Sequence, residues 1–137
     1  MRIVIIEDEM YAAKRLENMI MEFDPEIKIA AWLESVSESI EWFSNNPDPD
    51  LIFLDIHLED DLSFAIFEKV SVSSPIVFTT ATDELAVKAF MTKGIDFLHK
   101  PIVKNELTGM LEKYLKSGTD YRKPIGSGFF GDILENK

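Results

Sequence analysis

The sequence predicts an α/β fold in which a doubly wound parallel sheet of five strands carries helices on both faces. Five short apolar runs, bounded by turn residues, alternate with segments whose apolar residues recur at spacings of three and four. Such runs are typical of strands buried on both faces, and such spacings are typical of helices with one buried face. Because crossovers between parallel strands are nearly always right-handed, we expect the helices to be divided between the two faces.

The first half of the chain contains two strand-and-helix units. The first strand is expected at residues 3–7, and the helix after it ends before Pro25, because the residue before a proline avoids the helical region. The buried face of that helix is formed by Met10, Ala13, Leu16, Ile20 and Phe23. A second strand is expected at residues 27–32. Ser35 and Glu38 then have the spacing of a capping box, which predicts the start of the second helix.

The second half contains three more units. A cluster of Asn, Pro and Asp at residues 45–50 precedes the third strand at 51–54. The helical stretch after it carries Leu62, Ile66, Phe67 and Val70. A fourth strand at 76–79 leads to a helix that begins at Thr82, and the fifth strand spans 95–99. The last helix has its apolar residues at Leu107, Met110, Leu111, Tyr114 and Leu115. We therefore expect the flavodoxin-like strand order 2-1-3-4-5.

Length and composition indicate one globular domain followed by a short tail. The chain has 137 residues, of which 46% are hydrophobic, and this is enough for one domain with its own core. We place the domain at residues 1–118, where Gly118 ends the last helix. Residues 119–137 are rich in Gly, Ser and Lys, and we expect a linker, a disordered tail or the start of a missing output domain.

Charge and residue usage exclude several classes of protein. The formal net charge of -11 argues against a nucleic-acid-binding surface in this domain. Without cysteines, the chain can form neither a disulfide framework nor a thiolate metal site. Its apolar runs are too short for a membrane span or a signal peptide, so we expect a cytoplasmic protein with no membrane contact.

Polar residues follow four of the predicted strands. Asp8 follows the first strand and Asp55 the third, while Thr80 and Lys100 follow the fourth and the fifth. Because the carboxyl ends of parallel strands meet at one edge of a sheet, where ligands bind, we expect these side chains in one pocket. Carboxylates, a hydroxyl and an ammonium group together suit Mg²⁺ and a phosphoryl group.

Four segments at these strand ends resemble those of response-regulator receiver domains, the CheY-like superfamily. Residues 6–9 are similar to the acidic cluster of that family, and residues 54–58 are similar to its phosphoacceptor segment. Residues 78–81 look like the switch-threonine segment, and Phe-Leu-His-Lys-Pro at 97–101 looks like the aromatic-x-x-Lys-Pro end. The resemblance covers residues 1–117. Its details further resemble receivers attached to LytTR-type DNA-binding domains.

The resemblance implies a phosphoryl acceptor and a metal site. Asp55 would accept the phosphoryl group as a nucleophile, which requires that the incoming charge be neutralised. Mg²⁺ is the implied cofactor, and its ligands would be Asp8, Asp55 and the backbone carbonyl of His57. Glu7 stands where Asp is more frequent in the family, and it would reach the metal through a water molecule.

The resemblance also implies a switch. Lys100 would bind the phosphoryl oxygens, and the cis peptide that is typical before Pro101 would aim this lysine into the pocket. Thr80 would donate its hydroxyl group to the phosphoryl group once it is present. Phe97 would then swing inward, so that a local change of charge alters the surface formed by the fourth helix, fifth strand and fifth helix.

The partners and the output follow from the same family. The phosphodonor would be a sensor histidine kinase, and the surface around the fifth strand is a possible homodimer face. The protein would act in two-component signal transduction and regulate transcription through an attached or missing DNA-binding domain. The chain would catalyse only the transfer of a phosphoryl group to its own aspartate and the hydrolysis of that acyl phosphate, so we do not expect an enzyme.

Other classes of protein stay open as alternatives. A stand-alone phosphorelay receiver has the same site, and a pseudo-receiver would only bind a partner. A phosphotransferase of the haloacid dehalogenase type would place a second Asp at the position of His57. An FMN carrier would need a phosphate-binding loop where residues 7–9 are acidic.

The loop after Asp55 departs from the common receiver pattern. It lacks the usual proline and glycine and instead contains Glu59, Asp60 and Asp61. We expect this added negative charge near the site to tighten metal binding and to slow the reaction with small anionic phosphodonors.

Overall fold

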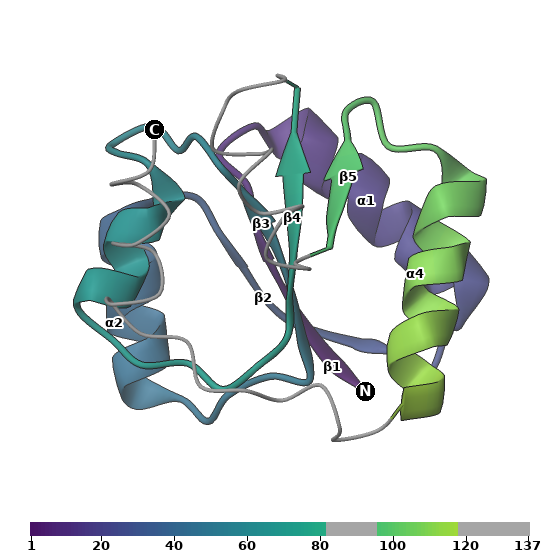
Figure 1. Ribbon diagram of the computed structural model, residues 1–137, viewed down its shortest axis with the longest axis horizontal. Helices are drawn as coiled ribbons and strands as arrows, with labels where there is room; N and C mark the ends of the chain where they lie inside the picture. Colours follow the sequence, from purple (N-terminus) through teal and green to yellow (C-terminus); the bar gives the residue numbers. More distant parts are fainter. Residues whose placement is uncertain (82–95, 118–137) are drawn as a thin grey trace.

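The computed structural model describes residues 1–81 and 96–117, which form a parallel sheet with helices on both sides (Figure 1). The strands are β1 (Arg2–Ile6), β2 (Lys28–Leu33), β3 (Leu51–Asp55), β4 (Ile76–Thr80) and β5 (Phe97–His99). All neighbouring strands pair in parallel, in the order β2-β1-β3-β4-β5. The predicted fold class and strand order are confirmed.

The helices cover both faces of this sheet. Helices α1 (Met10–Phe23) and α4 (Lys104–Ser117) lie on one face, and they contact each other. Helix α2 (Val36–Asn45) and a short 3-10 helix, η1 (Ser63–Glu68), lie on the other face (Figure 1). Among the described residues, no helix is long and apolar enough to cross a membrane.

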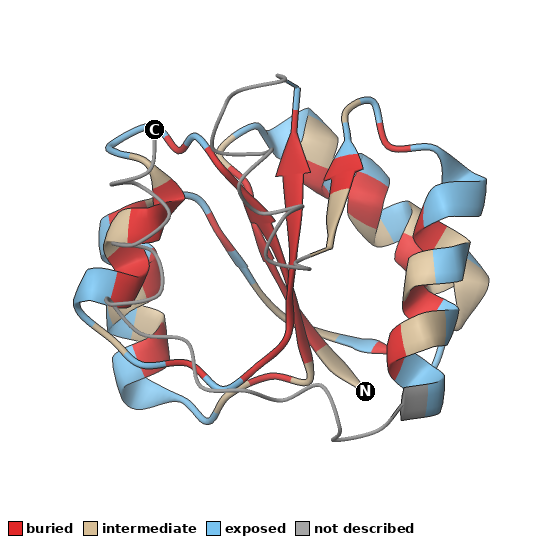
Figure 2. Ribbon diagram, viewed as in Figure 1, coloured by how far each residue is buried: buried red, intermediate tan, exposed pale blue. Residues whose placement is uncertain are grey.

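Each face of the sheet has its own hydrophobic core. Because successive residues of a strand point to opposite faces, β1 contributes to both cores. Ile3 and Ile5 belong to the cluster under α1 and α4, whereas Val4 and Ile6 belong to the cluster under α2 and η1. The central strands β1, β3 and β4 are almost entirely buried, and each helix turns a buried stripe toward the sheet (Figure 2). Two apolar layers therefore hold the strand ends in fixed positions.

The predicted cap of α2 is present. The Ser35 side chain accepts a hydrogen bond from the Glu38 amide, with N and Oγ 3.1 Å apart. The Glu38 carboxylate reaches back to the amide of Glu34, at 3.2 Å, rather than to that of Ser35. Both bonds satisfy main-chain donors that the first turn of a helix leaves without a partner. The local sequence therefore determines where α2 begins.

Three helical expectations differ from the structure. The stretch after β3 forms only the 3-10 helix η1, and four of its six residues are buried. Packing from several sides therefore fixes this segment, and the β-branched Val70 and Val72 after it do not favour a longer helix. Met10 is 68% exposed because α1 faces the sheet only from Ala13 onward, and Leu115 of α4 is 39% exposed.

Some expectations lie outside the described residues. These are the helix that begins at Thr82, the first residues of the fifth strand, the terminator Gly118 and the tail at 119–137.

The side chain of Ser63 is a buried polar group in an apolar layer. Its Oγ is fully buried and has no hydrogen-bond partner among residues 1–81 and 96–117. Leaving a buried hydroxyl unpaired costs about 1–3 kcal/mol. We expect Ser63→Ala to raise the free energy of unfolding by about 1 kcal/mol, measured by urea denaturation.

Ser74 provides the matched control for this prediction. It is equally buried, but its hydroxyl donates to the Pro49 carbonyl at 2.5 Å. Ser74→Ala should therefore lower stability, because it leaves that carbonyl without its donor. Two changes of the same sign and size would contradict the assignment.

Candidate functional site

The site lies at the carboxyl edge of the sheet, where the strand order reverses. Glu7 follows β1, and Asp55 and Thr80 are the last residues of β3 and β4. Lys100 follows β5, and its amide donates to the Thr80 carbonyl at 2.7 Å. β1 has β2 on one side and β3 on the other, so the two crossovers after β1 and β3 run to opposite faces and leave a crevice between them.

Three carboxylates meet in this crevice. Glu7, Asp8 and Asp55 each place a carboxylate oxygen within 4.8 Å of the others, and we call them the acidic cluster. Glu7 and Asp55 are buried, and Asp8 is half-buried. The sequence analysis predicted that Asp8 and Asp55 would share one pocket, and the structure brings them together with Glu7.

The ammonium group of Lys100 lies against the acidic cluster. Its Nζ donates to Asp55 Oδ2 at 3.0 Å and also donates to Glu7 Oε1. Only 20% of the Lys100 side chain is exposed, so both ion pairs are largely shielded from water. One ammonium group cannot balance three carboxylates, so the crevice keeps an excess of negative charge.

The pKa values in the cluster reflect this crowding. Burial raises the pKa of the Glu7 carboxyl, and the charge of Asp55 adds to the effect, against the bond from Lys100. Burial, together with the hydrogen bond and charge of Glu7, raises the pKa of Asp8. Burial lowers the pKa of Lys100, but its bonds to Glu7 and Asp55 outweigh this effect and leave the pKa raised. The acidic cluster therefore favours an additional cation.

The main chain of Glu7 is held on both sides. Its amide donates to the Leu33 carbonyl at 2.9 Å, and its own carbonyl accepts the indole N–H of Trp32 at 2.7 Å. Its Oε2 accepts the amide of Glu9 at 3.1 Å. The sequence analysis placed Trp32 in a strand and did not connect it with the site. No local pattern could have done so, because the two residues are 25 positions apart.

The loop after Asp55 folds back on itself. The His57 amide donates to Asp55 Oδ1 at 3.3 Å, and the Ser63 amide donates to the Ile56 carbonyl at 2.9 Å. His57 pairs with Leu62 in an isolated antiparallel bridge. His57, whose carbonyl was expected to bind the metal, is therefore held beside Asp55.

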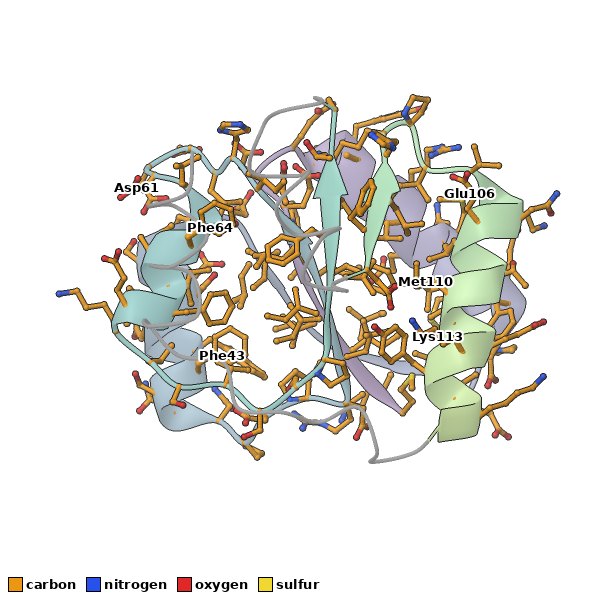
Figure 3. The ribbon with its side chains drawn as sticks, viewed as in Figure 1. Phe43, Asp61, Phe64, Glu106, Met110 and Lys113 are labelled. Carbon is orange, nitrogen blue, oxygen red and sulfur yellow. The ribbon has the colours of Figure 1, made fainter. Side chains whose placement is uncertain are left out.

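Asp60 of this loop has a partner that the sequence analysis did not foresee. Its carboxylate accepts the amides of Val36, at 2.9 Å, and Ser37, at 3.2 Å, at the start of α2. These backbone hydrogen bonds lower the pKa of Asp60. Asp61, labelled in Figure 3, accepts the amide of Leu62 instead. The charge of Asp60 is thus directed at the N-terminus of α2, where it stabilises the helix.

Removing the Asp60 carboxylate should lower stability. We expect Asp60→Ala to reduce the free energy of unfolding by about 1 kcal/mol at neutral pH, because two amides lose their acceptor. Since the pKa of Asp60 is lowered in the fold, this contribution is complete above the ordinary aspartate value of about 3.9 and is lost as the pH falls below it. Urea denaturation of the wild type and Asp60→Ala, at neutral pH and at a pH below about 3.9, measures this contribution.

The neighbouring Glu59 is the control for this prediction. It is exposed, and Glu59→Ala removes the same charge from the same loop. The two variants are expected to differ at neutral pH and to converge in acid. An equal loss from both would show that net charge, rather than the cap on α2, is responsible.

The residues of the expected switch lie beside the site. Thr80 is buried, and Phe97 is half-buried against the core under α2 and η1. The Phe97 ring meets the His99 ring edge-on, with centroids 5.1 Å apart. The peptide bond between Lys100 and Pro101 is cis, the geometry that the family resemblance implies. The helix expected after Thr82 lies outside the described residues, so only part of the possible dimer face is seen.

The donor set of the acidic cluster fits Mg²⁺. This cation prefers oxygen ligands and is commonly bound by one or two carboxylates together with phosphate oxygens. Within residues 1–81 and 96–117, Glu7, Asp8 and Asp55 form the one group of three or more metal-binding side chains close enough to share an ion. Asp55 ends a buried strand and is bonded to Lys100, and the neighbouring strand β4 ends in Thr80, an arrangement that further suits phosphoryl transfer.

Comparison with known proteins identifies the family. Residues 3–112 match the response regulator receiver domain, and the chain belongs to this family. The crystal structure of the response regulatory domain of protein mrkE from Klebsiella pneumoniae has the same fold, with a TM-score of 0.72 and 28% identity. That match covers 85% of this chain and 97% of the other. The predicted family is confirmed.

Similar full-length proteins specify the group. The sensory transduction protein LytT of Enterococcus faecalis is 35% identical over 119 residues, which are 85% of this chain and 48% of LytT. The transcriptional regulatory protein YpdB of Escherichia coli is 32% identical over 116 residues, which are 82% of this chain and 47% of YpdB. The predicted likeness to LytTR-type response regulators is therefore confirmed, and the chain spans about half the length of these relatives.

Proposed function

We propose that this chain is the phosphoryl-accepting module of a response regulator, and that Asp55 accepts the phosphoryl group from a sensor histidine kinase. The observation that carries the proposal is the meeting of the acidic cluster with Lys100 at the end of β3. In this arrangement the buried Asp55 carboxylate lies beside the Lys100 ammonium group and beside Glu7 and Asp8, two further carboxylates that could bind a metal. The chain acts as a signalling module in the cytoplasm, not as an enzyme with a separate substrate.

The proposed reaction is an in-line displacement at phosphorus. An Asp55 carboxylate oxygen forms the new P–O bond, while the P–N bond to the donor histidine breaks and its electron pair stays on the imidazole. Mg²⁺, when bound, neutralises negative charge on the carboxylates and the phosphoryl oxygens. Asp8 and Asp55 would bind it directly, together with the backbone carbonyl of His57, and Glu7 would bind through water.

Lys100 and Thr80 have roles on the phosphoryl side. The Lys100 ammonium group, which is bound to Asp55 and Glu7, would transfer its bonds to phosphoryl oxygens at the same place. The Thr80 hydroxyl would donate to another oxygen, and Phe97 would follow by moving inward. This change would shift the protein between two states and alter the surface around β5.

The output is proposed from the relatives. YpdB is named as a transcriptional regulatory protein, and the chain aligns with about half of it. We propose that residues 1–118 are the receiver domain and that residues 119–137 connect it to an output domain. Contact with DNA would be made by that domain alone, and the surface around β5 would form a homodimer.

Two alternatives share the fold but differ in chemistry. A stand-alone phosphorelay receiver would use the same reaction without an output domain. A pseudo-receiver would bind a partner without phosphorylation. Such a function does not require the bonds from Lys100 to Asp55 and Glu7. The haloacid dehalogenase reading has no support, because His57 stands where its second aspartate would be.

Incubation with acetyl phosphate and Mg²⁺ tests the proposal by intact mass. The wild type should gain one phosphoryl group, and the gain should vanish with EDTA or in Asp55→Asn. Because a missing adduct could also mean that a small phosphodonor reacts too slowly, beryllium fluoride should be tested in parallel as an acyl-phosphate mimic, with the amide NMR signals of Thr80 and Phe97 as the readout. No adduct and no signal change would favour the pseudo-receiver.

A further inference from the structure

The indole group of Trp32 donates a hydrogen bond to the main chain of the turn that carries Glu7 and Asp8. β2 ends at Leu33, whose carbonyl accepts the Glu7 amide, so the β1–β2 ladder has no further rung. The Glu7 carbonyl lies beyond that last rung, and it accepts the Nε1–H of Trp32 at 2.7 Å. The indole therefore supplies the donor that the β2 main chain would supply in a longer strand.

This bond acts on the peptide unit between two members of the acidic cluster. The peptide unit before Glu7 is held by Leu33, and the unit between Glu7 and Asp8 is held by Trp32. Because a peptide unit is planar, holding both units fixes the backbone dihedral angles of Glu7. The direction of its buried side chain toward Lys100, and the starting position of Asp8, then follow from the main chain.

Packing in a hydrophobic core does not explain why a tryptophan stands at this position. Trp32 lies on β2, an edge strand, and 37% of its surface is exposed. With Met10 and Tyr11 of the first turn of α1, it lines a surface cavity of about 570 Å³ rather than either core. A smaller residue would fill an exposed strand position as well, but among apolar side chains tryptophan offers a strong N–H donor at its edge.

We infer that Trp32 is a positioning residue for the Mg²⁺ site: its indole N–H fixes the Glu7–Asp8 peptide and thereby the geometry of the acidic cluster. The inference rests on the proposed function, since it assigns Trp32 a part in binding the metal of that site. Trp32 acts on the site through its hydrogen bond to Glu7.

The test compares two conservative variants by titration with Mg²⁺ alone. Trp32→Phe removes the N–H donor and keeps an aromatic ring, while Trp42→Phe changes the second tryptophan, on α2, in the same way. Isothermal titration calorimetry, at a temperature where circular dichroism shows all proteins folded, should give about fivefold weaker Mg²⁺ binding for Trp32→Phe. Trp42→Phe should bind as the wild type does.

NMR of the wild type provides a readout that needs no change at Trp32. The chain has two tryptophans, so its ¹⁵N spectrum contains two indole signals, and Trp42→Phe assigns them. The Trp32 indole signal should shift during the Mg²⁺ titration. The midpoint of this shift should agree with the affinity measured by calorimetry. A merely structural role would leave the Mg²⁺ affinity unchanged in Trp32→Phe while lowering its stability.

The outcomes separate this inference from the proposed function. If the wild type binds Mg²⁺ and Trp32→Phe binds it equally well, the role of Trp32 is overturned and the metal site stands. An indole signal that stays in place throughout the titration would overturn it too. If the wild type binds no Mg²⁺ at all, both the metal site and the role of Trp32 fail.

Discussion

Lys100→Met is expected to destabilise the protein without Mg²⁺ and to slow its phosphorylation strongly. The substitution keeps an unbranched side chain of similar length but removes the ammonium group that bonds to Asp55 and Glu7. Two buried carboxylates then face each other without a counter-charge, and breaking a buried pair costs several kcal/mol. Because 20% of the lysine side chain is exposed, we expect a smaller loss of about 2 kcal/mol.

Mg²⁺ should reverse much of this loss. If the acidic cluster binds Mg²⁺ as proposed, the metal binds only the folded state and stabilises it in proportion to its affinity. Without the ammonium group, the cluster attracts a divalent cation more strongly, and Mg²⁺ should raise the stability of the variant more than that of the wild type. Urea denaturation of both proteins, with and without Mg²⁺, measures the two effects.

The reaction itself should be slower even when Mg²⁺ is saturating. In the proposed reaction Lys100 would supply positive charge where the phosphoryl group arrives, and loss of one such group typically costs about a hundredfold in rate. The rate of the mass increase with acetyl phosphate gives this number directly.

Lys104→Met is the matched control for Lys100→Met. Lys104 begins α4 and pairs with Glu22 of α1 at 3.1 Å, but both side chains are more than half exposed. An exposed pair of this kind contributes little, so we expect no response to Mg²⁺ beyond that of the wild type. Equal effects from both lysines would mean that net charge, and not the buried bonds, sets the behaviour of the site.

Phe78→Ala should cause the largest loss of stability of any single substitution considered for this chain. Phe78 lies in β4, is fully buried and packs edge-on against Phe64 of η1, with ring centroids 6.0 Å apart. Replacing a buried phenylalanine by alanine costs about 3–5 kcal/mol through lost burial and the cavity that remains. Figure 3 shows Phe43 and Phe64 pointing from α2 and η1 toward this side of the sheet.

A graded series tests the cause of this loss. Phe78→Leu leaves a smaller cavity and should cost about half as much as Phe78→Ala in urea denaturation. Since Thr80 is two residues further along β4, the alanine variant should also weaken any response of Thr80 to beryllium fluoride. A loss below about 1 kcal/mol for the alanine variant would show that this layer does not behave as a close-packed core.

The sheet and the acidic cluster were predictable because each depends on a repeated or local pattern. Apolar runs locate the strands, and parallel pairing then brings the residues at the strand ends together, however far apart they are in sequence. This explains why Asp8, Asp55 and Lys100 could be placed in one pocket from the sequence alone. The cap formed by Ser35 was predictable for a similar reason, since it involves residues three positions apart.

The parts that the sequence analysis missed depend on contacts without such a pattern. Trp32 reaches Glu7 from a neighbouring strand, and Asp60 reaches Val36 from a different crossover. Both contacts arise from the positions of side chains in the folded molecule. The length of η1 was missed because tertiary packing, rather than an amphipathic period, determines it.

The hydrogen bonds that Asp60 accepts from Val36 and Ser37 could transmit a structural change at Asp55 to α2. They join the loop beside Asp55 to the start of α2, on the face of the sheet opposite α1 and α4. If the loop moves, the N-terminus of α2 must move with it, or the two hydrogen bonds to the Asp60 carboxylate must break. If Asp55 is phosphorylated as proposed, a displacement of this loop would therefore be passed to α2, separately from the proposed change at Thr80 and Phe97.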